Sequence, residues 1–239
     1  KVKHFVQHSA RPPVFSVAAK KAKSADGITA EKIISFNTTE TKTIIGNSLQ
    51  AGSRFGPTLF LIACCSQVIS RLGSQKNKSG DLWIPVPYDG RLKGANGPLI
   101  SNTVSFLFYR IPQQELATIP QTVKYLGAQM MEQIKQGIPQ RYTLFLNMMR
   151  HVPLWLYYFL VSKTGKGVFA SYLYTSTGDN FNNLRSLFGE PIRDINMIPA
   201  LTFPPGLTFV FLKHDNELSV NIAYSPEVIG EADLDFIEQ

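Results

Sequence analysis

The sequence has few of the residues that build disulfide scaffolds and metal centres. Two of its 239 residues are cysteine, and these two, Cys64 and Cys65, are adjacent in an apolar, helix-like stretch. Neighbouring cysteines seldom close a disulfide in regular structure, because a bridge needs α-carbons about 4.4–6.8 Å apart with convergent side chains. We therefore expect free, buried thiols and a reducing, intracellular compartment. No C-x-x-C pair or other metal-ligand spacing occurs, so we expect no metal site.

The sequence also lacks an unbroken run of about 20 apolar residues, the length that a membrane-spanning helix needs. The apolar stretch at residues 144–161 is interrupted by Arg150, His151 and Pro153. Two interpretations of this stretch stay open. A core helix broken at the proline is favoured because the charges fall in mid-run, and the alternative is an apolar patch that contacts a lipid substrate or the periphery of a membrane.

Charged residues are scarce as well, at 17% against 44% hydrophobic, and this balance predicts a folded core rather than a disordered chain. The formal net charge is +7. Much of the excess comes from stretches that resemble linkers or loops, namely Lys1, Lys3, Arg11, Lys20, Lys21, Lys23, Arg71, Lys76 and Lys78. The sequence has no Gly-rich phosphate loop and no basic helix with interleaved aromatic residues, so we expect solvated charge and no nucleic-acid partner.

The residues that are present divide the chain into two parts. Residues 1–30, with Pro12, Pro13 and a Lys-rich run, predict a tether, and residues 31–239 predict one folded lobe. The first residue is lysine and not methionine. Three interpretations of the chain therefore stay open: a fragment, a processed product, or the ordered part of a longer protein.

Helix and strand patterns alternate within the lobe. Asn37 and Glu40 form a capping box that begins one helix, and Pro57 and Gly73 mark the expected start and end of a second helix. Apolar residues at steps of three and four predict a third helix over residues 118–136. A short terminal helix is expected near the end of the chain.

Six segments show strand patterns: residues 33–36, 81–91, 103–112, 167–176, 207–213 and 217–225. The last two predict a hairpin. Its second arm alternates Leu218, Val220, Ile222 and Tyr224 with small or polar residues, which is typical of a strand that buries one face. Together these elements predict an α/β fold, an α+β two-layer sandwich whose mixed, largely antiparallel sheet is flanked by helices.

Three landmarks follow one another along these elements. The first is IPVPYDGR, with Asp89 and Arg91 two positions apart at a strand end. The second is SNTVSFLFYRIP, in which Asn102 precedes Pro112 by ten positions, and the third is YLYTSTGDN, followed by the apolar hairpin. With these landmarks the chain resembles the C-terminal lobe of the chloramphenicol acetyltransferase-like acyltransferase superfamily. In pattern it is most similar to the wax ester synthase/diacylglycerol acyltransferase family, and more distantly to condensation domains. The resemblance covers residues 31–239, although Ser101 stands where the family has glycine.

The resemblance implies one lobe of a two-lobed enzyme that moves an acyl group from a thioester, acyl-CoA or a phosphopantetheine carrier, to a lipid-like alcohol. It also implies an active-site tunnel between the lobes. The polar residues expected on this lobe's wall of the tunnel are Asn102, Ser105, Ser176 and Thr177. The other interpretation is that these four satisfy backbone groups in turns. Asp89 and Arg91 are expected to form an ion pair that fixes their turn.

Acyl transfer to an alcohol needs a base beside the acceptor. In the resembled superfamily an H-H-x-x-x-D motif of the N-terminal lobe supplies this base. The four histidines of this chain are His4, His8, His151 and His214, and none belongs to such a motif. We therefore expect no catalytic residue here and a missing N-terminal lobe, or a partner chain, that carries the base. Two further hypotheses stay open: a non-catalytic binding or structural subunit, and a condensation-type domain acting on carrier-bound groups.

Overall fold

The structure is a computed structural model that describes residues 14–17, 29–89, 104–156, 170–178, 181, 184–199, 201–203 and 205–238. Its strands are β1 Ala30–Phe36, β2 Leu82–Asp89, β3 Val104–Ile111, β4 Leu173–Ser176, β5 Ser186–Leu187, β6 Glu190–Pro191, β7 Leu207–His214 and β8 Glu217–Tyr224. Its helices are α2 Thr38–Gln50, α3 Thr58–Gln75, α4 Ile119–Lys135, α5 Ile138–Met149 and α7 Glu231–Glu238, with a 3-10 turn at Gln113–Leu116.

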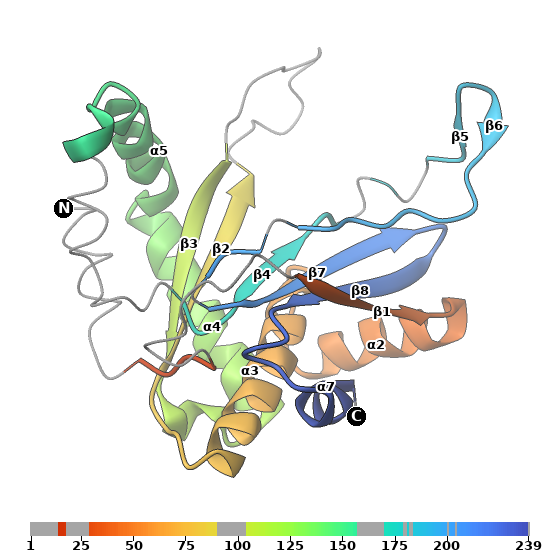
Figure 1. The fold of residues 1–239 in the computed structure, drawn as a ribbon, viewed down its shortest axis with the longest axis horizontal. Helices are drawn as coiled ribbons and strands as arrows, with labels where there is room; N and C mark the ends of the chain where they lie inside the picture. The colour runs from red at the N-terminus through yellow and green to blue at the C-terminus, as the bar shows by residue number, and fades with distance from the viewer. Residues whose placement is uncertain are drawn as a thin grey trace.

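A four-stranded sheet in the order β1–β8–β7–β4 forms the centre of the fold (Figure 1). Strand β8 pairs antiparallel with β1 and β7, whereas β7 and β4 run parallel. The β7–β8 hairpin turns at Asp215 and Asn216, whose φ angles of 47° and 64° suit the two-residue turns that hairpins prefer. The predicted mixed, largely antiparallel sheet is confirmed, and it is an open sheet rather than a closed barrel.

Helices α2, α3 and α7 lie on one side of this sheet (Figure 1). Alternate residues of β7 and β8 point toward them and join the main cluster of buried side chains. Its members include Phe209, Phe211, Val220 and Ile222 from the strands and Leu61, Ile62 and Ile69 from α3. One layer of helix packed on one layer of sheet is the predicted two-layer sandwich.

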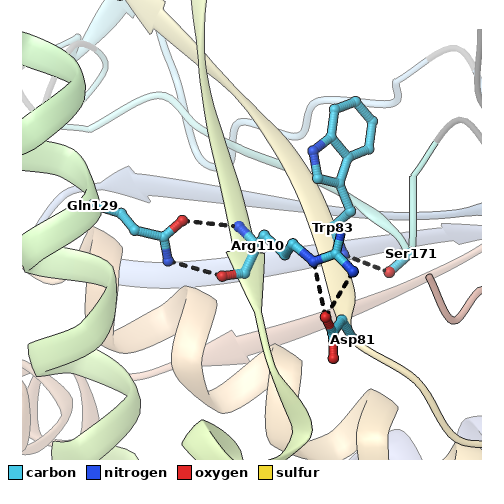
Figure 2. A network of polar contacts seen from close by, with 5 residues as sticks. All are labelled: Asp81, Trp83, Arg110, Gln129 and Ser171. Atoms are coloured by element: carbon cyan, nitrogen blue, oxygen red, sulfur yellow. Dashed lines mark hydrogen bonds and ion pairs between the residues drawn. The ribbon is translucent and has the colours of Figure 1, made fainter. Parts of the chain in front are cut away.

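A separate two-stranded ribbon, β2–β3, packs against α4, and two glutamines of this helix cover the outer edge of β3. Gln133 donates to the carbonyl of Phe108 and accepts from its N–H, both at 2.8 Å. Gln129 does the same for Arg110, at 2.9 and 3.0 Å (Figure 2). Four residues of helix and two residues of strand both span about 6 Å, so the two side chains match the repeat of the strand. These bonds pair the outward-facing N–H and carbonyl groups of Phe108 and Arg110, which an edge strand would otherwise leave without partners.

The ribbon joins the main sheet at Ser171, just before β4. The Ser171 N–H donates to the carbonyl of Trp83, and its hydroxyl accepts from the Trp83 N–H, both at 2.8 Å (Figure 2). The same hydroxyl donates to the carbonyl of Phe15 at 2.5 Å. Beside it, the Arg110 guanidinium binds one oxygen of Asp81 through two nitrogens at 2.8 Å. These contacts hold β2, β3 and β4 in one arrangement.

The predicted tether fails for residues 14–17, because Phe15 and Val17 are 6% and 4% exposed and belong to the main core. Phe15 also explains why α3 continues past Gly73, its predicted end. A Cβ at Gly73 would lie 2.8 Å from the Phe15 ring, so the glycine makes room for this ring inside the helix. The rest of the tether, and the boundary at residue 30, stay predictions.

Two burial predictions are wrong in opposite directions. Strand β8 was expected to bury one face, yet Asn221 and Ala223 of the expected polar face are 4% and 0% exposed. The interpretation of residues 144–161 as core is wrong for the described part, because α5 and the turn after it expose large apolar side chains. These are Leu144, Met148, Leu154 and Trp155, between 64% and 73% exposed. Residues 157–161 lie outside the described part. Within that part, no helix combines the length and apolarity needed to cross a bilayer.

Buried thiols and phenols should make the fold sensitive to base. Both cysteines are free, with Cys65 buried and Cys64 partly exposed. Burial raises the pKa of Cys64 to about 11, and it raises the pKa values of Cys65, Tyr172 and Tyr174 above their ordinary range. The folded chain therefore keeps protons that the unfolded chain begins to release above about pH 8.5.

Since the folded state binds more protons in that range, stability is complete below about pH 8.5 and is lost as the pH rises toward the folded pKa values. We expect the free energy of unfolding in urea to fall by about 4 kcal/mol between pH 8 and pH 10, about 2 kcal/mol for each thiol. Replacing Cys65 by alanine should lower stability at pH 8 and make the fall with pH smaller. An unchanged pH dependence in Cys65→Ala would contradict this account.

Candidate functional site

The predicted site residue Ser105 lies in β3, where it is 1% exposed. Its hydroxyl donates to the carbonyl of Pro139 at 2.5 Å, and this bond ties the ribbon to the start of α5. The bond engages the hydroxyl with a backbone carbonyl 34 residues away in the chain, and not in a turn, where the second interpretation expects it. Its part in a tunnel wall stays a prediction.

Asp89 ends β2 directly opposite Val104, the first residue of β3. The first two sequence landmarks therefore meet at one end of the β2–β3 ribbon. Arg91 and Asn102, which belong to these landmarks, lie outside the described residues. The predicted ion pair of Asp89 and Arg91 and the predicted role of Asn102 consequently stay untested.

Ser176 and Thr177 stand together at the end of β4, far along the chain from Ser105. The exposed Ser176 hydroxyl accepts from the N–H of Gly178 at 3.3 Å. The Thr177 N–H donates to the carbonyl of Phe211 at 3.0 Å, which extends the pairing of β4 with β7 by one residue. Thr177 thereby continues the alternation of β4 and falls on the side of the sheet away from the helices.

That second side of the sheet carries polar residues that the sequence did not single out. Cross-strand partners share a face, and Thr208 pairs with Ala223 while Val210 pairs with Asn221. All four lie on the face opposite the core residues of β7. Val210 is 1% exposed, yet it does not belong to the core that the helices build. We call this side of β4, β7 and β8 the second face.

Three buried oxygen atoms of the second face have no hydrogen-bond partner within the described residues: Thr208 Oγ1, Asn221 Oδ1 and Thr177 Oγ1. The Asn221 amide nitrogen donates to Glu31 at 3.2 Å, so the acceptor half of this amide is what remains unused. Leaving such a group unpaired costs about 1–3 kcal/mol. Folded proteins pair nearly all buried polar groups, and within the described residues the second face holds three of the five buried side-chain oxygens without a partner, the other two being Ser16 Oγ and the Tyr174 hydroxyl.

His214 lies at the far end of the same face of β7 and acts as an anchor. Its Nε2 bonds with the carbonyl of Leu184 at 2.8 Å, and it is 9% exposed. Next to it, Arg185 forms an ion pair with Asp215. These contacts hold the base of the segment that leads to β5 and β6. Among the described residues, no cluster of three or more His, Cys, Asp or Glu side chains could hold a metal ion. The polar groups of the second face are the two threonine hydroxyls and the Asn221 amide, beside the Glu31 carboxylate to which this amide donates.

No protein-family model and no curated protein matches this sequence. Solved structures do match its fold. The trichothecene 15-O-acetyltransferase TRI3 from Fusarium sporotrichioides matches with a TM-score of 0.68 and 12% identity over 99% of this chain and 50% of its own. VibH, a nonribosomal peptide synthetase condensation enzyme, matches with a TM-score of 0.62 and 13% identity over 100% of this chain and 53% of its own.

A third match is the nonribosomal peptide synthetase FmoA3, with a TM-score of 0.64 and 15% identity over 99% of this chain and 24% of its own. The chain thus spans about half the length of TRI3 and VibH and a quarter of FmoA3. At such low identity the likeness concerns the fold, and one fold serves several reactions. The chain has the α/β fold of one half of a chloramphenicol acetyltransferase-like or condensation domain.

Proposed function

We propose that this chain is the C-terminal half of an acyltransferase that moves an acyl group from a thioester to the hydroxyl of a lipid-like alcohol. The observation that carries the proposal is the second face of the sheet, where three buried oxygen atoms have no partner in the described part of the chain. The likeness of the fold to about half of an acetyltransferase and half of a condensation enzyme supports it. A second lobe would cover this face and leave a tunnel between the two halves.

In this proposal the second face binds the thioester arm. Thr208 Oγ1 can donate to a carbonyl, and Asn221 Oδ1 can accept from an amide N–H, and a pantetheine arm offers both groups. The base would come from an H-H-x-x-x-D motif of the other lobe, as the resemblance implies. The base removes the proton of the alcohol while its oxygen attacks the thioester carbonyl. The new C–O bond replaces the C–S bond, and the proton passes to the leaving thiolate.

The segment around β5 and β6 is well placed to reach a second lobe. It projects beyond the β7–β8 hairpin as an arm (Figure 1). Phe188 at its turn is 99% exposed, and Leu187 and Ile198 are 56% and 65% exposed. The base of the arm is anchored through Leu184 and Arg185. Apolar side chains that an anchored arm holds away from the body fit a surface supplied by another lobe or chain.

Replacing Phe188 by serine should therefore weaken the association of the two lobes at least tenfold, because burying a phenylalanine contributes about 1.5–3 kcal/mol. The measurement is titration of this chain with a separately expressed second lobe. Phe55, 72% exposed between α2 and α3, provides the matched control, and Phe55→Ser should leave the affinity unchanged. Equal affinities for the two variants would contradict a role for the arm.

A condensation-type domain is the second candidate, and the likeness to VibH favours it. A phosphopantetheine carrier is acidic, which suits the net charge of +7. The third candidate, a non-catalytic binding or structural subunit, rests on the absence of the base from the sequence. These candidates differ in the donor they accept and in whether product forms.

The test uses the full-length protein that contains this chain. It is incubated with a long-chain alcohol and either acyl-CoA or a carrier-bound acyl group, and ester is measured by mass spectrometry. We expect ester from acyl-CoA with the full-length protein and none with this chain alone. Product from the carrier-bound donor only would indicate the condensation type. The absence of product with either donor, in a protein without an H-H-x-x-x-D segment, would indicate the structural subunit.

A further inference from the structure

The outer side of α5 and the turn after it expose apolar side chains that the fold does not bury. Leu144 and Met148 are 64% and 71% exposed, and Leu154 and Trp155 are 73% and 71% exposed. Leu144 and Met148 are four residues apart, so they share one stripe of the helix. The backbone then turns tightly, with hydrogen bonds at 3.2 Å from His151 to Met148 and at 3.0 Å from residue 156 to residue 153. We call these four side chains the α5 surface.

The inner side of α5 already fixes the helix to the ribbon. Tyr142 packs edge-on against Phe108 and Phe106, with ring centroids 5.1 and 5.7 Å apart. Ile138 is 2% exposed, and Pro139 accepts the hydrogen bond from Ser105. The exposure of the α5 surface is therefore not the result of a loosely attached helix. Another explanation is needed for so many large apolar side chains in water.

The charge of this region is of one sign. Arg141 precedes Leu144 by one helical turn on the same stripe, Arg150 follows the last residue of α5, and both are exposed. Between residues 133 and 178 the sequence contains five lysines and arginines and no aspartate or glutamate. Apolar side chains, a tryptophan and flanking cations are the combination found where helices lie in the interface of anionic bilayers.

We propose that the α5 surface is a docking site for an anionic phospholipid bilayer. Leu144, Met148, Leu154 and Trp155 enter the boundary of the acyl chains, while Arg141 and Arg150 bind phosphate groups of the lipids. Helix α5 and the β5–β6 arm lie at opposite ends of the molecule's long axis (Figure 1). A second lobe on the arm and a bilayer on α5 can therefore be bound together. The site is independent of which transfer reaction the protein performs.

The test is sedimentation of the full-length protein with vesicles of phosphatidylcholine, with and without phosphatidylserine. We expect binding to the anionic vesicles, at least tenfold weaker binding to the neutral ones, and a loss of binding at high salt. Trp83 is 7% exposed and Trp155 is 71% exposed, so a blue shift of tryptophan emission on binding that is absent from Trp155→Phe would report Trp155.

The variant Leu144→Glu/Met148→Glu should lower the affinity for anionic vesicles at least tenfold, and Arg141→Gln should lower it about fivefold. Phe55→Glu, at an equally exposed phenylalanine elsewhere, is the control and should bind as wild type. Circular dichroism checks that the variants fold. The proposal is overturned if wild type does not bind anionic vesicles or if the double variant binds them as well as Phe55→Glu. It is also overturned if the double variant loses affinity for the second lobe, which would assign the surface to a protein contact.

Discussion

Replacing Gln133 by leucine should lower the free energy of unfolding by about 3 kcal/mol, because the change leaves two buried backbone groups without partners. Gln133 is 3% exposed, and its amide bonds with both the N–H and the carbonyl of Phe108. Leucine fills a similar volume, so the loss comes from the unpaired groups rather than from a cavity. Urea denaturation measures the stability, and hydrogen exchange at the Phe108 amide shows whether the local bond has opened.

Gln136, the residue that directly follows the end of α4, provides the matched control. It is exposed, and its side chain donates to the Glu132 carboxylate at 2.5 Å. Gln136→Leu should change stability by less than about 0.5 kcal/mol. If Gln133→Leu unfolds at the same urea concentration as Gln136→Leu, the hydrogen bonds of Gln133 do not stabilise the edge of β3.

Replacing Thr208 by valine should raise stability while it lowers the activity of the complete enzyme. The Thr208 hydroxyl is buried and has no partner among the residues that the structure describes, and removing an unpaired buried hydroxyl gains about 1 kcal/mol. Valine keeps the shape and suits a central strand. If the hydroxyl binds the thioester arm, its loss should lower kcat/KM about tenfold, the effect of about 1.4 kcal/mol on the transition state.

Ser66 provides the control, because its hydroxyl is also buried but forms a hydrogen bond within the fold. Its hydroxyl lies 2.8 Å from that of Tyr172, and it is 0% exposed. Ser66→Ala should lower stability by about 1 kcal/mol and leave kcat/KM unchanged. The two variants should thus move stability and activity in different ways. A Thr208→Val variant that is less stable and fully active would show that this hydroxyl serves folding alone.

Signals that depend on a few neighbouring residues were readable from the sequence. The capping box is an example, since Asn37 accepts from the N–H of Glu40 at 3.0 Å and Glu40 accepts from the N–H of Asn37 at 2.8 Å. Both partners lie within one turn, so their bonds do not depend on the rest of the fold. The prediction that α3 ends at Gly73 was wrong. The glycine is needed there because the ring of Phe15, from a segment far earlier in the chain, leaves no room for a side chain.

The candidate site was predicted only in part. Of the second-face residues, the sequence singled out Thr177, because turns and strand ends commonly carry polar residues. Thr208 and Asn221 were missed, since a polar residue within a strand normally indicates the solvent side. That rule fails where both neighbours of a strand are strands and both of its faces are buried, as for β8.

By itself, the sequence determined most of the helices, the longer strands and where the β7–β8 hairpin turns, because these follow from periodicity and turn residues close together in the chain. Only the tertiary structure decided which strand faces are buried, that residues 14–17 enter the core, and that α5 presents apolar side chains to solvent. Burial depends on contacts between segments far apart in the chain, and periodicity within one segment carries no information about its neighbours.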